Sequence, residues 1–149
     1  FECYLTMRGL KTYPLRIERQ NENAAAVAQH LAAHRKIEAV YYPGLPGYPD
    51  RETAERLLEA GRYGAMVSFE VAGAAKEDIF ALFDRFRMIV PATSLGDVHA
   101  LALYPVIASH RDLPPKQRER LGIKENLVRL SVGIEAVEDI LADLDQALG

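Results

Sequence analysis

The sequence contains a single cysteine, Cys3. One cysteine cannot form a disulfide bond within the chain, a composition typical of a cytoplasmic protein. No apolar run approaches the roughly 20 residues of a membrane-spanning helix, and no signal peptide is evident. The net charge of −3 includes no excess of positive charge, so it favours neither nucleic acid nor an anionic membrane as a partner.

The rest of the composition is that of a soluble globular domain. The chain has 149 residues, of which 49% are hydrophobic and 26% are charged, so one domain with a sizeable core is expected. The first residue is Phe1 rather than methionine, and helical sequence begins almost at once. These features suggest that residues 1–149 are a single domain of a longer protein.

Apolar residues recur with spacings that alternate between those of helices and strands. The predicted strands cover residues 38–42, 64–71, 88–90 and 127–134. A long helix is predicted over residues 1–35, which Pro14 should kink or divide, with Asn21 and Asn23 as alternative caps. Shorter helices are predicted after Asp50, around Ile79 to Phe86, after Pro115 and at the end of the chain. This order predicts an α/β fold with a small, mostly antiparallel or mixed four-stranded sheet and helices on one side.

Residues 92–113 fit neither pattern. The segment is long and apolar but has no clear period, and such segments in compact domains are usually functional or disordered. It has too many Leu, Val and Ile residues for disorder. Ser94-Leu95-Gly96-Asp97 opens the segment with small residues that would let a ligand approach the backbone, although the same residues suit an ordinary turn.

Arg129 is the main candidate for a binding residue. Its neighbours Val128, Leu130 and Val132 form an apolar strand face, so Arg129 should point to the opposite face. A guanidinium held there could bind a carboxylate through two parallel hydrogen bonds. The pattern alone favours the plainer alternative, a solvated arginine on an uncovered sheet face.

The histidines do not predict a metal site. His99 and His110 flank the apolar part of the irregular segment without supporting cysteine or carboxylate spacing. His30 and His34 lie four residues apart on a predicted helix, but the glutamate of the zinc-protease motif is absent between them. A solvated helix face is the interpretation for this pair, and no metal is expected.

Five blocks, in order along the chain, resemble a single enzyme family. They are Arg8-Gly9-Leu10-Lys11-Thr12, Val40-Tyr41-Tyr42-Pro43-Gly44-Leu45, Gly64-Ala65-Met66-Val67-Ser68-Phe69-Glu70, Ser94-Leu95-Gly96-Asp97 with Ser109-His110, and Leu127-Val128-Arg129-Leu130-Ser131-Val132-Gly133-Ile134-Glu135. Together they resemble the C-terminal domain of the trans-sulfuration (Cys/Met metabolism) family of fold-type I pyridoxal-phosphate enzymes. The resemblance implies that residues 1–35 form the helix between two domains and that 1–149 form the C-terminal substrate-binding domain.

The resemblance also implies roles for individual residues. Arg129 would grip the α-carboxylate of the substrate, and Ser94 would help to hold the same group. The residues expected near the mouth of the substrate site are Leu95, Gly96, Asp97, His99 and Tyr104. The family commonly has a glutamate where this chain has His99, and a His-Pro pair where it has Tyr104-Pro105. Both departures leave the preferred sulfur substrate open.

The implied cofactor is pyridoxal 5'-phosphate, bound by a large N-terminal domain that residues 1–149 do not include. In that family the cofactor-binding lysine follows a Ser-x-Thr pair, and no lysine here has this context, so this segment alone is expected to be inactive. The complete protein is expected to be a cytoplasmic homo-oligomer, a tetramer in this family. Its expected activity is γ-elimination or γ-replacement on a sulfur-containing or O-acylated amino acid.

Several functions remain open within this prediction. Asp97 favours a methionine γ-lyase, while O-acetylhomoserine sulfhydrylase and cystathionine γ-synthase or γ-lyase are the alternatives within the family. A domain that acts alone as a non-catalytic binding or interaction module is the alternative from another class.

Overall fold

The computed structural model describes residues 1–149 as six helices and five strands. The helices are α1 (Glu2–Leu10), α2 (Tyr13–Ala33), α3 (Arg51–Leu57), α4 (Lys76–Arg85), α5 (Pro115–Arg120) and α6 (Val137–Leu148). The strands are β1 (Ile37–Tyr41), β2 (Met66–Val71), β3 (Val90–Pro91), β4 (Leu101–Leu103) and β5 (Leu127–Ser131). No helix of the structure is both long enough and apolar enough to cross a membrane.

The five strands form one sheet in the order β1-β2-β5-β4-β3. All neighbouring strands are antiparallel except β3 and β4, which are parallel, so the mixed and mostly antiparallel sheet is as predicted. The predicted number of four strands is wrong, because β4 lies inside the segment 92–113 that was expected to be irregular. Residues 100–106 are all buried, so this strand has no polar face and no alternation by which to recognise it.

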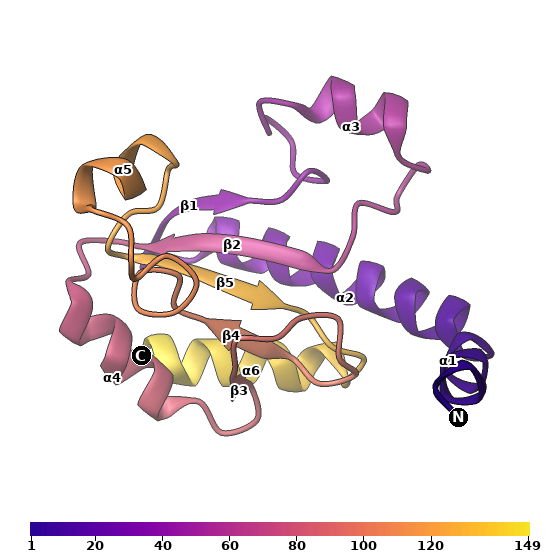
Figure 1. Cartoon of the computed structure of the whole chain (residues 1–149). Helices are drawn as coiled ribbons and strands as arrows, with labels where there is room; N and C mark the ends of the chain where they lie inside the picture. Colours follow the sequence, from indigo (N-terminus) through magenta and orange to yellow (C-terminus); the bar gives the residue numbers. More distant parts are fainter.

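The helices α2, α4 and α6 cover one face of the sheet (Figure 1). Between the sheet and these helices lies a core of 21 buried residues. The central strand β5 supplies Val128 and Leu130, each with no exposed surface, and α6 supplies Ile140 and Leu144. This core is closed within the chain itself, and it leaves the opposite face of the sheet without a helical layer.

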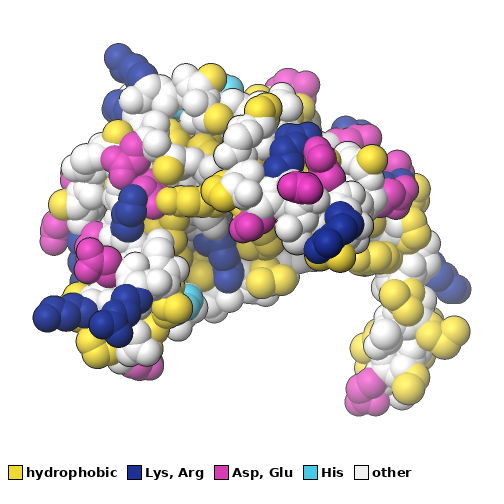
Figure 2. All heavy atoms as spheres, turned by 90° about the horizontal axis from the view of Figure 1, so that it is seen from above, with side chains coloured by type: hydrophobic (Ala, Val, Ile, Leu, Met, Phe, Trp, Pro, Cys, Tyr) yellow, Lys and Arg dark blue, Asp and Glu magenta, His cyan; other side chains and the backbone are white.

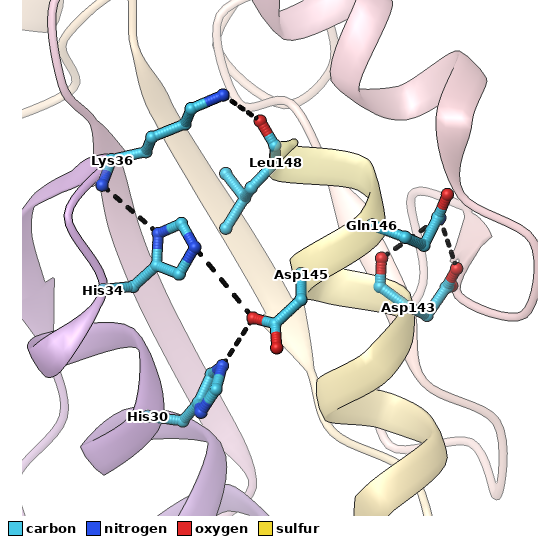
Figure 3. Close-up of polar contacts among 7 residues, drawn as sticks. All are labelled: His30, His34, Lys36, Asp143, Asp145, Gln146 and Leu148. Carbon is cyan, nitrogen blue, oxygen red and sulfur yellow. Dashed lines mark hydrogen bonds and ion pairs between the residues drawn. The ribbon is translucent and has the colours of Figure 1, made fainter.

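Polar contacts join α6 to the end of α2 and to the residues after it (Figure 3). His30 Nε2 lies 2.6 Å from Asp145 Oδ1, and His34 Nε2 lies 4.0 Å from the same oxygen. Lys36 Nζ donates a hydrogen bond of 2.7 Å to the carbonyl of Leu148. The expected solvated face for His30 and His34 is therefore wrong, because both rings face an acidic side chain on a neighbouring helix. No group of three His, Cys, Asp or Glu side chains is arranged to hold a metal ion.

The N-terminal helical region is divided at Lys11 and Thr12, and Pro14 lies in the first turn of α2. A proline there removes no helical hydrogen bond, which explains why the break precedes it. None of the α1 residues is buried, and Figure 2 shows this part of the chain projecting from the body with hydrophobic side chains on its surface. Asn21 and Asn23 do not cap a helix as suggested, because α2 continues through both and buries them.

Candidate functional site: a desolvated arginine beneath a loop

Arg129 lies in the middle of β5, directly opposite Ser68 of β2 and Leu103 of β4. Directly paired residues share one face of a sheet, so these three side chains lie on the face that the helices do not cover. The alternation of β5 dictates this, because Val128 and Leu130 fill the core on the other side. The sheet therefore holds Arg129 on a rigid element, with its side chain on the open face.

The Arg129 guanidinium is partly buried, and some of its N–H groups make no hydrogen bond within the chain. Nη2 donates a hydrogen bond of 3.0 Å to the backbone carbonyl of Ser94. Nε is buried and has no hydrogen-bond partner in the chain. Burial lowers the pKa of Arg129 below its ordinary value, although a guanidinium stays charged at neutral pH. A desolvated cation with an unpaired N–H is costly by itself and is well suited to bind a carboxylate.

Residues 94–99, here called the site loop, cross the open face next to Arg129. The Ser94 side chain is exposed, and neither its hydroxyl nor its N–H makes a hydrogen bond within the chain, so both are free for a ligand. Gly96 has a φ of +76°, which a residue with a side chain rarely adopts, and its N–H donates to Ser131 Oγ at 2.9 Å. The structure thus brings Ser94 and Arg129 together, as the sequence suggested.

Asp97 and His99 form a small polar pair at the far end of the site loop. Asp97 Oδ1 accepts the N–H of Val98 at 2.6 Å and lies 3.5 Å from His99 Nδ1. The hydrogen bond from Val98 is the main reason why the pKa of Asp97 is below its ordinary value, and His99 lowers it further. Both side chains are more than half exposed, so this pair faces solvent.

Leu95 and Tyr104 occupy contrasting positions. Leu95 is 58% exposed on the site loop. Tyr104 is only 2% exposed, and its hydroxyl donates a hydrogen bond of 2.6 Å to the carbonyl of Glu125. Burial raises the pKa of Tyr104 to about 12. Its ring packs edge-on against Phe80 of α4, so the structure places Tyr104 in the core and does not bring it to the guanidinium.

Sequence reasoning missed several residues that hold the site loop in place. Asn23 of α2 is 1% exposed and donates hydrogen bonds to the carbonyls of Gly133 and Glu135. Glu135 accepts the N–H of Ala100 at 2.7 Å, where the site loop enters β4. Gln20, also on α2, donates to the carbonyl of Asp97 at 2.7 Å. Gln20 and Asn23, two buried amide residues within one turn of an otherwise apolar helix stripe, were the available signal.

The lysines of the chain do not surround this site. Lys36 is held by Leu148, Lys124 pairs with Glu70 at 2.7 Å, and Lys76 lies over a phenylalanine ring. The remaining two, Lys11 and Lys116, are exposed on the helical segments that carry them. The residues around Arg129 therefore suit a carboxylate ligand, and they offer no amine and no phosphate cradle to bind pyridoxal phosphate itself.

An arginine on the open face of a mixed sheet, under a loop with free donors, is an arrangement that suits a carboxylate ligand. The family of Cys/Met metabolism PLP-dependent enzymes matches this chain over residues 1–149. The chain is 41% identical to cystathionine gamma-lyase of Dictyostelium discoideum and 42% identical to L-methionine gamma-lyase of Fusobacterium nucleatum subsp. polymorphum, over 99% of its length in both cases. The chain belongs to the Cys/Met metabolism PLP-dependent enzyme family.

The match covers only part of these relatives, 38% and 36% of their respective lengths. The same is true of a solved structure, cystathionine gamma synthase from Xanthomonas oryzae pv. oryzae in complex with aminoacrylate and cysteine. It superposes with a TM-score of 0.90 and 39% sequence identity, over 97% of this chain and 37% of that chain. The fold is therefore that of one part of a PLP-dependent enzyme of fold type I.

Proposed function

We propose that this chain is the substrate-binding domain of a pyridoxal-phosphate enzyme that acts on sulfur-containing amino acids, with a methionine γ-lyase-like activity. Arg129 binds the α-carboxylate of the substrate, and Ser94 supplies a further donor to the same group. A larger domain, which residues 1–149 do not include, carries the cofactor and the lysine that binds it. The complete protein is a homo-oligomer, and this segment alone does not turn over substrate.

The observation that carries this proposal is the unpaired Nε of Arg129. A buried polar atom without a partner costs roughly 1–3 kcal/mol, so its persistence calls for an explanation. A carboxylate bound through the guanidinium nitrogens would neutralise this partly buried cation and bring an acceptor to the site. The free hydroxyl and N–H of Ser94 lie on the loop directly above, where a second carboxylate oxygen would come.

The domain's part in the reaction is orientation. The cofactor, once bound by the other domain, supplies stabilisation of negative charge on the carbon atoms next to the substrate amine. Arg129 fixes the carboxylate at one end of the substrate, and this sets the direction of the bond that breaks. The core beneath β5 keeps Arg129 from moving away when the substrate is released.

Two other functions remain as alternatives. O-acetylhomoserine sulfhydrylase and cystathionine γ-synthase or γ-lyase activity would use the same carboxylate site, and the exposed pair of Asp97 and His99 faces the space where such substrates would differ. A non-catalytic binding module is the alternative from another class. It would need the carboxylate site but no second domain.

The test is a pair of substitutions of Arg129 in the complete protein, with L-methionine and L-cystathionine as substrates. We expect Arg129→Ala to lower kcat/KM by an amount equivalent to about 2–4 kcal/mol, because a carboxylate that is misplaced also misplaces the scissile bond. Arg129→Lys should cost nearly as much, since lysine keeps the charge but loses the planar fork.

Arg118→Lys is the matched control. Arg118 is also largely buried, and its guanidinium also donates to a backbone carbonyl, that of Leu113. It lies on α5, so its loss should leave kcat/KM unchanged. Near-normal activity of Arg129→Lys, or an equal loss in Arg118→Lys, would show that Arg129 is structural and would remove the basis of the proposal.

A further inference from the structure

Four hydrogen bonds join the site loop to other parts of the chain, and three of them involve β5 or the residues just after it. In these three bonds, Arg129 donates to the carbonyl of Ser94, the N–H of Gly96 donates to Ser131 Oγ, and the N–H of Ile134 donates to the carbonyl of Val98. A loop anchored along a single line can still tilt about that line. These three bonds alone therefore leave the height of Ser94 above the guanidinium undetermined.

The fourth tie comes from a different element. Gln20 of α2 donates a hydrogen bond of 2.7 Å to the carbonyl of Asp97. Gln20 is 5% exposed, and its bond to the loop is partly buried. Since α2 packs against β1, β2 and α6, it provides an anchor away from the line of β5. A hydrogen bond from a second element, away from β5, is needed to fix the tilt of the loop.

We propose that Gln20 is a positioning residue for the carboxylate site. By holding the carbonyl of Asp97, it sets the tilt of the site loop and thereby the place of the Ser94 hydroxyl and N–H relative to Arg129. This inference rests on the proposed function, because it assumes that Arg129 and Ser94 bind the substrate carboxylate. Gln20 does not touch the substrate and acts through the loop.

The neighbouring residue provides a built-in control. Asn21 is also an amide on α2 and is also 5% exposed. Its Oδ1 accepts the N–H of Gly64 at 2.7 Å, and its Nδ2 donates to the carbonyl of Ile17. These bonds hold the start of β2 and make no contact with the site loop. Loss of the Asn21 amide should therefore affect stability without affecting the loop.

The first measurement is hydrogen exchange by mass spectrometry on the complete protein, read from the peptide that contains residues 94–99. Gln20→Met keeps the length of the side chain and removes the donor, so exchange of the Gly96 N–H, the amide of this peptide that is bonded to Ser131, should become about tenfold faster. Gln20→His keeps an N–H donor at similar reach and should restore slow exchange. Asn21→Leu should leave this peptide unchanged.

The second measurement separates positioning from folding. Gln20→Met should raise KM for L-methionine about tenfold with little change in kcat, because the ground state loses a carboxylate contact. Inhibition by 3-(methylthio)propylamine, which has the same chain without the carboxylate, should be unchanged. Gln20→His should recover KM, and Asn21→Leu should not alter it.

The outcomes distinguish a failure of the role of Gln20 from a failure of the proposed carboxylate site. Unchanged exchange in the Gln20→Met peptide, or unchanged KM while Arg129→Lys raises it, overturns the role of Gln20 and leaves the carboxylate site intact. An Arg129→Lys variant with normal KM overturns the proposed function and this inference with it. An equal rise in KM for Asn21→Leu would show that any damage to α2 suffices, and would also overturn the inference.

Discussion

Asp143 should contribute more to stability than any other carboxylate on α6. The residue is 5% exposed and accepts the backbone N–H groups of Arg87, Met88 and Ile89 at 2.9, 3.0 and 2.8 Å. Gln146 donates to it as well, one helical turn later (Figure 3). These bonds fix the turn between α4 and β3, and the chain runs from that turn through β3 to the site loop.

The magnitude follows from the number of donors that would be left without an acceptor. Asp143→Ala removes an ionised acceptor from three backbone N–H groups, at roughly 1–3 kcal/mol for each donor that stays buried. Because water can reach part of the turn, we expect a total loss of about 3 kcal/mol of the free energy of unfolding. Asp145→Ala is the control, since Asp145 is half exposed and its pair with His30 should contribute at most about 1 kcal/mol.

The assay is urea unfolding of the 149-residue chain, followed by circular dichroism between pH 3 and pH 7. Burial alone would raise the pKa of Asp143, but the N–H groups of Ile89, Arg87 and Met88 hold it below the ordinary value of 3.8. A carboxyl whose folded-state pKa is lowered stabilises the fold above its unfolded-state pKa, and this contribution is lost as the pH falls through the folded-state value.

The difference between the wild type and Asp143→Ala should therefore be full at pH 7 and should shrink below about pH 4. Equal destabilisation by Asp143→Ala and Asp145→Ala at pH 7 would refute the reasoning. A difference that does not depend on pH would show that the lost packing of the side chain, and not its charge, accounts for the effect.

Two further substitutions test the two ends of β5. Gly133→Ala should destabilise the chain by about 1–3 kcal/mol, because a Cβ would meet the N of Ala100 and the O of Val98, each at 2.5 Å; a normal urea midpoint would contradict this. Lys124→Met should destabilise it by about 1–3 kcal/mol, because Glu70 is fully buried and would lose its counter-ion. Adding Glu70→Gln should recover part of that loss in a double-mutant cycle, and strict additivity would show that the pair does not interact.

The strands that were predicted well are those with one polar and one apolar face. β2 and β5 both alternate, and the structure buries Val67, Phe69, Val128 and Leu130 completely, as expected. Alternation exists in these strands because one side faces helices and the other faces the open surface. Their register, which places Arg129 opposite Ser68, is set by contacts between strands and could not be read from either strand alone.

The elements that were mispredicted lack that asymmetry. β4 is buried on both faces, so its residues Leu101–Leu103 carry no period. The helix predicted after Asp50 is present as α3, but its apolar residues lie outside the core. Leu57 is 71% exposed and Leu58 is 43% exposed, because the helix lies away from the sheet. Local pattern predicts that a helix forms, but only tertiary packing decides what that helix covers.

In the candidate site too, local sequence predicts some residues and tertiary packing decides the others. Arg129 and Ser94 were predicted because they stand in recognisable blocks, and the fold brings them within hydrogen-bonding distance. Gln20 and Asn23 were missed because an amide on a helix is ordinarily solvated or a cap, and nothing local shows that it faces a loop more than 70 residues away. Long-range hydrogen bonds from side chain to backbone leave no periodic trace in the sequence.

The two faces of the sheet therefore differ in how far their polar groups are paired. On the helical side, polar groups are paired: Asp143 satisfies three N–H groups, and Asn23 satisfies two carbonyls. On the open side, Arg129 keeps a buried N–H without a partner and Ser94 keeps free donors. Besides Arg129 Nε, only Glu135 Oε2 is a buried side-chain polar atom without a partner in the chain, so an unmet donor on the open face calls for an explanation. The unmet donors on the open face are best explained by a ligand that completes them, and a carboxylate is the group whose geometry matches an arginine fork.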